Sequence, residues 1–247
     1  MQLFSPFCPS CRESLARNGE SFTCSRCGRV FPQKNGIIDF LSSFPISEEQ
    51  KIVQKNFDSM SDTYDNTIVR LVEGLGCSWR TYTGKLEGFM AKAGGKVILD
   101  VGCGTAFPAG SFIPQTSIYV GLDISLQMLE HAQSLLGGSL NAAFWGIDAE
   151  RIPLPDSCID LCLVLMGLNV FPNPEKTVEE IRRVVKRDGE VFGTAFMQQP
   201  QGDEGSHERP LSVGSIRKTF AAFDSSIWDM SVETEGGILF FNINKKL

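Results

Sequence analysis

The chain has 247 residues, of which 42% are hydrophobic and 21% are charged, and this composition is typical of an ordinary globular protein, which excludes the fibrous and disordered classes. No apolar run approaches the roughly 20 residues that a membrane span needs, and residues 1–11 lack the basic and apolar segments of a secretory signal. We therefore expect a cytoplasmic protein with no membrane partner. The net charge of −6, without any Lys/Arg-rich tract, makes a nucleic-acid surface less favoured.

Four of the eight cysteines form two Cys-x-x-Cys pairs, Cys8 with Cys11 and Cys24 with Cys27. Two thiolates on one tight turn offer one edge of a tetrahedron and a second such turn offers the other, so the pattern predicts a zinc ribbon. Asn18-Gly19 between the pairs predicts a hairpin tip. Since four cysteines leave no open ligand position, the zinc would be structural, and its removal should unfold the ribbon and spare the rest. Disulfides are the alternative, which a reducing cytosol disfavours.

Two further short strands, at 30–32 and 36–41, are expected to complete a zinc-ribbon domain over residues 1–45. Residues 46–95 are expected to form a helical lid. Ser47 precedes acidic residues as a helix cap would, and apolar side chains follow at helical spacing up to Tyr64. A second helix is predicted over 78–93, before Gly94-Gly95.

From Lys96 onward, apolar runs of strand length alternate with helical segments. This alternation predicts an α/β domain over residues 96–247, with a mostly parallel sheet and helices on both faces. The predicted strands are 97–101, 118–122, 142–147, 159–166 and 191–196, and a terminal hairpin is predicted from 226–233 and 238–245. The clearest helices are 125–136, with Met128, Leu129, Ala132, Leu135 and Leu136 on one face, and 174–187, closed by Asp188-Gly189.

The glycine loop Asp100-Val101-Gly102-Cys103-Gly104-Thr105-Ala106 follows the first strand of this domain. At the carboxyl end of a parallel strand, glycines allow the backbone to approach a ligand closely. A dinucleotide fingerprint would need a small residue where Phe107 stands, and a phosphate-binding P-loop would need Lys-Ser/Thr after the glycines. Both of these readings are therefore disfavoured.

Acidic residues also end the next two predicted strands. Asp123 could accept hydrogen bonds from both hydroxyls of a ribose. Asp148, next to the small Ala149, could hold an exocyclic amine and leave room for an adenine ring. Each aspartate alone could equally be a strand-end cap, but their order along the chain favours one binding crevice.

With these motifs the chain resembles the class I S-adenosylmethionine-dependent methyltransferases, in the large group typified by the ubiquinone-biosynthesis enzymes. The resemblance runs from about Phe57 to the end and includes Leu99–Thr105, Gly121–Ser125, Asp148–Glu150 and Glu180–Glu190. It implies a Rossmann-like sheet of seven strands with the last pair reversed, and an enzyme that uses S-adenosylmethionine. The cofactor-binding residues that it implies are Asp100, Gly102 and Gly104 for the methionine end, Asp123 for the ribose, Ile124, Asp148 and Ala149 for the adenine, Met166 between cofactor and acceptor, and Tyr64 on the lid.

One position departs from the family pattern. Ala106 stands where a third glycine is usual, and we expect its methyl group to tighten the pocket slightly. Pro108 is expected in the first turn of the next helix. His207, in a polar insert after the fifth strand, is the candidate general base, with a solvated loop histidine as the alternative, whereas His131 is expected at the surface.

The resemblance implies direct in-line transfer of a methyl group, with catalysis mainly by alignment and exclusion of water. The acidic balance of residues 46–247, which hold 18 basic and 26 acidic side chains, favours a small-molecule acceptor. The ribbon resembles the zinc-binding domain of 23S ribosomal RNA guanine methyltransferases, and its five basic residues leave RNA as the runner-up. A non-catalytic protein that binds S-adenosylmethionine or docks a partner is the third hypothesis.

Overall fold

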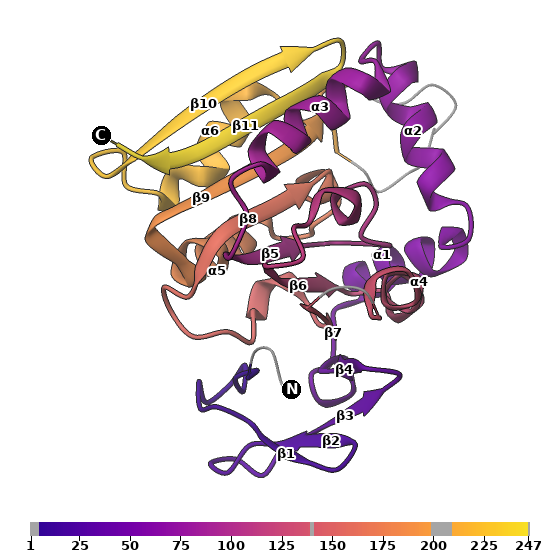
Figure 1. Cartoon of the computed structure of the whole chain (residues 1–247), viewed down its shortest axis with the longest axis vertical. Helices are drawn as coiled ribbons and strands as arrows, with labels where there is room; N and C mark the ends of the chain where they lie inside the picture. Colours follow the sequence, from indigo (N-terminus) through magenta and orange to yellow (C-terminus); the bar gives the residue numbers. More distant parts are fainter. Residues whose placement is uncertain (1–4, 139–140, 199–208, 247) are drawn as a thin grey trace.

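A computed structural model describes residues 5–138, 141–198 and 209–246 of the chain. One sheet runs through the whole molecule in the order β1-β2-β3-β4-β7-β6-β5-β8-β9-β11-β10 (Figure 1). Its seven strands from β7 to β10 are those expected of the Rossmann-like domain. Among the described helices, none combines the length and the apolar character that crossing a membrane would require.

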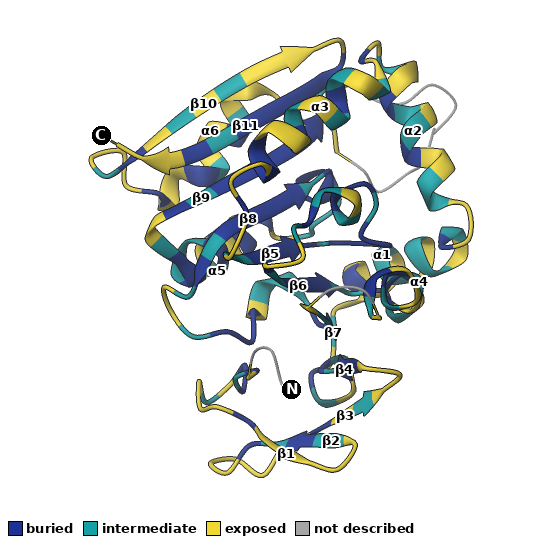
Figure 2. Ribbon diagram, in the orientation of Figure 1, coloured by how far each residue is buried: buried dark blue, intermediate teal, exposed yellow. Residues whose placement is uncertain are grey.

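Apolar strands with polar ends make up the centre of the sheet, where both faces are covered and the strands are buried (Figure 2). β5, β6, β7, β8 and β9 are parallel to one another, and β11 runs antiparallel to both β9 and β10. The predicted terminal hairpin is thus confirmed, with β11 inserted between β9 and β10. The bounds are β5 Val97–Val101, β6 Ile118–Asp123, β7 Asn141–Gly146, β8 Ile159–Leu165, β9 Val185–Phe196, β10 Trp228–Glu235 and β11 Ile238–Lys245.

Two buried clusters lie on the two faces of the sheet. On one face, helices α2 (Tyr64–Gly74), α3 (Trp79–Met90) and α4 (Leu126–Leu136) contribute apolar side chains. On the other face, α5 (Pro174–Val184) and α6 (Val213–Thr219) do so. Helix α1 (Glu48–Met60) packs on α4, and its Ser47 capping box confirms the predicted start. The three short 3₁₀ helices used below are η2 (Ala109–Phe112), η3 (Ala149–Arg151) and η4 (Gly167–Asn169).

Three details of the predicted elements are wrong. Helix α5 ends at Val184, because Val185 is already extended and pairs with Ile159 of β8, so Asp188-Gly189 lies within β9. Leu135 does not face the core and is 58% exposed. Pro108 caps the short η2 instead of lying inside a helix, because no longer helix forms there.

The N-terminal ribbon is built from β1 (Ala16–Asn18), β2 (Ser21–Thr23), β3 (Val30–Lys34) and β4 (Ile37–Asp39). Gly19 has a φ of 61° at the tip of the β1–β2 hairpin, as Asn18-Gly19 predicted. Unexpectedly, β4 pairs in parallel with β7 and so joins the ribbon to the edge of the main sheet. The side chains of Leu15, Phe22 and Phe31 belong to the same buried cluster as the sheet. The boundary at residue 45 stays a prediction, but the ribbon and the body share one core.

Candidate functional site

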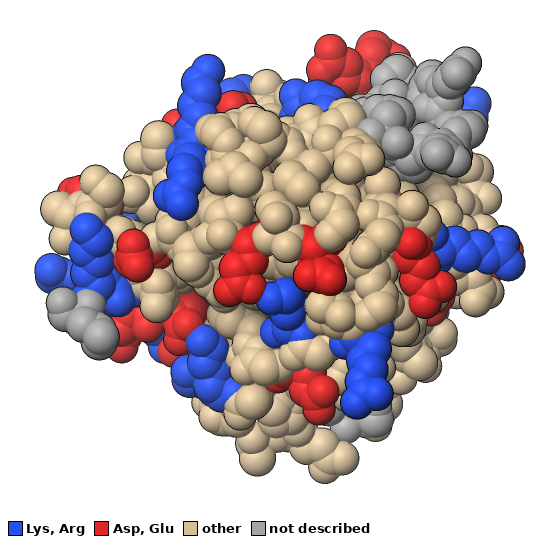
Figure 3. Space-filling view, turned by 90° about the horizontal axis from the view of Figure 1, so that it is seen from above, with Lys and Arg blue, Asp and Glu red and all other residues tan. Residues whose placement is uncertain are grey.

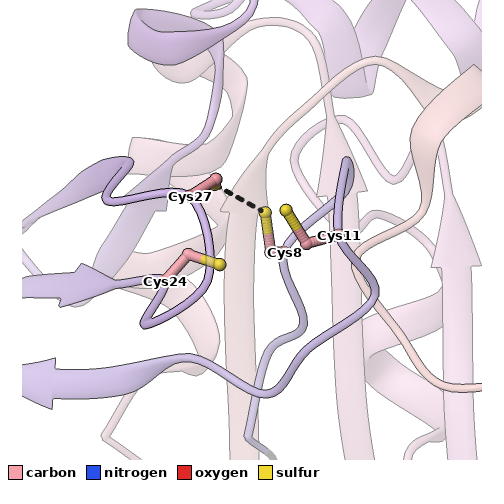
Figure 4. Close-up of side chains that lie close together, drawn as sticks. All are labelled: Cys8, Cys11, Cys24 and Cys27. Atoms are coloured by element: carbon pink, nitrogen blue, oxygen red, sulfur yellow. Dashed lines mark hydrogen bonds between the residues drawn. The ribbon is translucent and has the colours of Figure 1, made fainter.

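The four ribbon cysteines converge on one point. Their Sγ atoms all lie within 4.8 Å of one another, with Cys8 3.8 Å from Cys27, and all four are free thiols (Figure 4). Cys8 and Cys24 are buried, Cys11 is half-buried and Cys27 is exposed. The backbone N–H of Arg29 lowers the pKa of Cys27 to about 6. Four convergent sulfur ligands from two turns fit a tetrahedral zinc ion, with no position left for a substrate.

The glycine loop begins at the carboxyl end of β5, at the edge of the central strands. Gly102 and Gly104 have φ values of 72° and 54°, in the left-handed region that favours glycine. A Cβ atom on Gly102 would lie 3.1 Å from the ring of Phe171, so the position also lacks room for a side chain. Ala106 has a φ of 64° and is 1% exposed, and its methyl group packs in the buried cluster of the lid face. The methyl group is therefore not among the groups that line the cavity described below.

Asp100 is the most deeply buried acid of the loop region, at 1% exposure. Its Oδ2 accepts a hydrogen bond from the Tyr119 hydroxyl at 2.7 Å, whereas its Oδ1 has no hydrogen-bond partner. Burial raises the pKa of Asp100 to about 7, despite the opposing hydrogen bond from Tyr119. A buried carboxylate oxygen without a donor is costly, and an ammonium group of a ligand would satisfy it. This observation fits the methionine end of S-adenosylmethionine.

Asp123 ends β6 and connects the glycine loop to helix α4. Its Oδ2 accepts from the Gly104 N–H and its Oδ1 from the Ser125 N–H, both at 2.8 Å. Burial raises the pKa of Asp123 to about 6, against the effect of these two donors. Each oxygen retains a second lone pair, so the carboxylate can still accept from two hydroxyls.

Asp148 follows β7 and begins η3. Its Oδ1 accepts from the Glu150 N–H at 3.0 Å, and its Oδ2 accepts at 2.8 Å from the side-chain amide of Gln50 on α1. Gln54, one turn further along α1, donates to the carbonyl of Ile124 at 2.8 Å. Sequence reasoning missed Gln50 and Gln54, because Gln50 looks like the partner in a capping box and nothing local indicates what α1 covers.

These residues share one cavity with a free volume of about 1030 Å³, counted out to the solvent. Of the residues predicted to bind the cofactor, the cavity brings together Tyr64, Gly102, Gly104, Asp123, Ile124, Asp148, Ala149 and Met166. Asp100 lies in an adjoining smaller hollow that shares Tyr64, Gly102 and Met166 with the cavity. Among the described lining residues the charged ones are Asp123, Asp148 and Glu150, all acidic. Such a lining suits a cationic ligand and offers no cation to a pyrophosphate.

Most of the remaining lining is apolar and comes from the lid, from the segment after β8 and from the end of β9. The apolar character of the lid in the sequence predicts that side chains such as Phe57, Met60 and Leu71 close over an organic molecule, whereas no sequence signal indicated the apolar residues beyond the lid. The apolar lining residues of these three segments are Val53, Phe57, Met60, Ile68, Leu71, Val170, Phe171, Pro172 and Phe196. Tyr64 lies over the glycine loop, 3.5 Å from where a Cβ on Gly104 would be. Met166 has a φ of 60°, and its N–H donates to the Thr194 carbonyl.

The structure describes one of the two histidines, and that residue does not line the cavity. His131 is 3.2 Å from Asp62 at the surface, as expected. His207, the candidate general base, lies outside the described residues. Within the described lining no histidine, lysine or arginine is present.

The strand order and the glycine loop define an α/β protein with the Rossmann-like fold of the methyltransferase class. In agreement, residues 99–193 match the family model described as a methyltransferase domain. The chain is 30% identical over 176 residues to the ubiquinone/menaquinone biosynthesis C-methyltransferase UbiE of Hydrogenovibrio crunogenus, covering 68% of each chain. The chain belongs to the class I S-adenosylmethionine-dependent methyltransferases, in their ubiquinone-biosynthesis group.

Two further comparisons define the extent of the likeness. The chain is 29% identical over 155 residues to a demethylmenaquinone methyltransferase of Clavibacter sepedonicus, covering 63% of this chain and 62% of that one. It therefore spans about three fifths of that relative's length. A crystal structure of an S-adenosylmethionine-dependent methyltransferase from Aquifex aeolicus has the same fold, with a TM-score of 0.58 at 20% identity over 77% of this chain and 98% of that one.

Proposed function

We propose that this protein binds S-adenosylmethionine in the acidic cavity and transfers its methyl group to a small, uncharged organic acceptor. The observation that carries the proposal is the buried Asp100 Oδ1, which has no hydrogen-bond partner and lies beside a cavity whose described charged groups are all acidic. A ligand with an ammonium and a sulfonium group matches this distribution of charge. The zinc site of the ribbon, Cys8, Cys11, Cys24 and Cys27, would be structural.

When bound, S-adenosylmethionine would supply an electrophilic methyl group, its sulfur would keep the electron pair of the broken carbon–sulfur bond, and the acceptor atom would lose a proton in exchange for the methyl group. Asp100 would hold the methionine end of the cofactor and Asp123 its ribose. Asp148 would hold the exocyclic amine of the adenine. Apolar side chains of the lid exclude water and align the acceptor, which accounts for most of the rate in such reactions.

A small-molecule acceptor is supported by the apolar lid and by the relatives, two of which are named for menaquinone or ubiquinone biosynthesis. The runner-up, ribosomal RNA, depends on the five basic residues of the ribbon. Four of these already have partners within the chain. They are Arg12, which pairs with Glu180, Arg17, which donates to Gly19 and Gln33, Arg26, which lies 3.6 Å from Glu13, and Arg29, which lies over the ring of Phe44. Figure 3 shows the end of the molecule that lies away from the ribbon, and on this face of the body acidic and basic side chains are interspersed, without a continuous basic area among the described residues.

The deciding experiment offers methyl-labelled S-adenosylmethionine and the purified protein to two fractions of a cell extract, total RNA and small organic metabolites. We expect label in the metabolite fraction, and none when the Asp100→Asn variant replaces the wild type. Label in ribosomal RNA alone would favour the runner-up. Cofactor binding by calorimetry without label in either fraction would favour the non-catalytic hypothesis.

The raised pKa of Asp100 predicts that cofactor binding depends on pH. Below pH 7 the unliganded protein keeps a proton on Asp100, which an ammonium ligand must displace. Binding of S-adenosylhomocysteine should therefore tighten roughly tenfold between pH 5.5 and 7 and release a proton. In the unliganded protein, stability contributed by protonated Asp100 is present below the unfolded pKa and lost as the pH rises through about 7.

Calorimetry in two buffers of different ionisation enthalpy counts the released protons. The Asp100→Asn variant is the control, because it keeps the shape of the side chain but cannot titrate. Equal pH slopes in the variant and the wild type would contradict the assignment of Asp100 to the cofactor.

A further inference from the structure

The first cysteine turn of the ribbon contacts the body of the protein through the two residues that flank it. Phe7, next to Cys8, donates its N–H to the carbonyl of Pro153 at 2.8 Å. Arg12, next to Cys11, donates one guanidinium nitrogen to the carbonyl of Ile152 at 3.2 Å and another to Glu180 at 2.9 Å. A metal that closes this turn would therefore also fix two donors aimed at the body.

The segment that these donors hold carries part of the candidate cofactor site. Ile152 directly follows η3, which Asp148 caps at its N-terminus and whose residues Ala149 and Glu150 line the cavity. The ribbon also holds the other end of this segment, because Phe40, just after β4, donates its N–H to the carbonyl of Gly146 at 2.9 Å. The turn from Gly146 to Ile152 is thus fixed at both ends by the ribbon.

Arg12 is itself fixed in place. It has a φ of 58°, and its N–H donates to the Cys8 carbonyl at 2.9 Å, so its backbone conformation is part of the cysteine turn. Its partner Glu180 has a side-chain exposure of 13% and also accepts from the Ile152 N–H and from Arg183. Burial acts to raise the pKa of Glu180, but the arginine hydrogen bonds outweigh it and leave the pKa lowered, which keeps the carboxylate charged. One charged network therefore joins the ribbon to both backbone groups of Ile152.

We propose that Arg12 is a positioning residue for cofactor recognition: anchored by the first cysteine turn, it sets the η3 turn and thereby the place at which Asp148 meets the adenine amine. This inference rests on the proposed function, in which Asp148 holds that amine. It gives the ribbon a role in the cofactor site that is separate from binding a substrate or a partner.

The test measures binding of two ligands by calorimetry: S-adenosylhomocysteine and S-inosylhomocysteine, which has an oxygen in place of the exocyclic amine. In the zinc-loaded Arg12→Ala variant of the 247-residue chain, affinity for S-adenosylhomocysteine should fall roughly tenfold, the scale of one hydrogen bond to a charged group. Affinity for S-inosylhomocysteine should change much less, so the ratio of the two affinities, which measures the preference for adenine, should fall. Arg12→Lys, which keeps the charge but not the fork geometry, should restore part of the preference.

Arg17→Ala is the matched control, because Arg17 is an exposed ribbon arginine whose hydrogen bonds go to Gly19 and Gln33 within the ribbon. It should bind both ligands within about twofold of the wild type, the level of a neutral surface substitution. Zinc content and thermal unfolding are measured for every variant. An unchanged adenine preference in Arg12→Ala, or an equal loss for both ligands, would overturn the inference alone. Absence of S-adenosylhomocysteine binding in the wild type would overturn the proposed function as well.

Discussion

Replacing Asp123 by alanine is expected to weaken binding of S-adenosylmethionine by about 1.5–3 kcal/mol, the usual cost of losing hydrogen bonds to a charged group. The carboxylate lines the cavity and is held in place by the Gly104 and Ser125 N–H groups, which leaves each oxygen a second lone pair for a ribose hydroxyl. Titration calorimetry with S-adenosylhomocysteine measures the loss.

From the sequence one would expect Asp123→Ala to leave the fold unchanged, and the structure qualifies that expectation. Since Asp123 also anchors the glycine loop, the alanine variant leaves two N–H groups without their acceptor, and thermal unfolding should be recorded beside binding. Asp123→Asn keeps one acceptor oxygen, so comparison with Asp123→Ala separates the loss of cofactor binding from the loss of the glycine-loop anchor. Asp188, an exposed acid near the start of β9, is the control, and its Asp188→Ala variant should bind S-adenosylhomocysteine as the wild type does. Wild-type affinity in Asp123→Ala would remove this residue from the site.

Removal of the metal is expected to destabilise the whole chain and not the ribbon alone. Elemental analysis of protein purified without chelators should find one zinc per chain, and structural zinc contributes on the order of 10 kcal/mol to folding in small zinc domains. Because Leu15, Phe22 and Phe31 share a buried cluster with the central sheet, an unfolded ribbon would expose part of that cluster and the edge of β7. We therefore expect chelation to lower the temperature of the main unfolding transition.

Cys24→Ser should reproduce the effect of the chelator, since Cys24 is a buried member of the thiol cluster. Cys158→Ala is a suitable control, because Cys158 lies outside that cluster and is half-buried. Differential scanning calorimetry with and without chelator distinguishes one lowered transition from two separate ones. Protein that contains neither zinc nor iron, or that unfolds identically after Cys24→Ser, would contradict the metal site.

The sequence by itself determined most of the local structure. Patterns within a few residues of one another predict the five parallel strands, the Ser47 and Ser125 helix starts and the Asn18-Gly19 hairpin. The convergence of the four cysteines follows from two such short patterns that lie twelve residues apart. Hydrophobic period, capping residues and ligand spacing are local signals, and a parallel sheet brings the strand ends together at one edge. For this reason the sequence alone predicts that Asp100, Asp123 and Asp148 lie around one crevice.

Contacts between distant segments were decided only by the tertiary structure. No local pattern indicates that β4 pairs with β7, that Gln50 of α1 meets Asp148, or that Arg12 reaches Ile152 and Glu180. The early end of α5 has the same origin, because Val185 gains a strand partner in Ile159 that outweighs its helical neighbours. The unpaired Asp100 Oδ1 is also a tertiary fact, since burial and the single donor Tyr119 come from strands that only the folded sheet brings together. Pairing energies of this kind depend on which surfaces meet, and that information is spread over the whole chain.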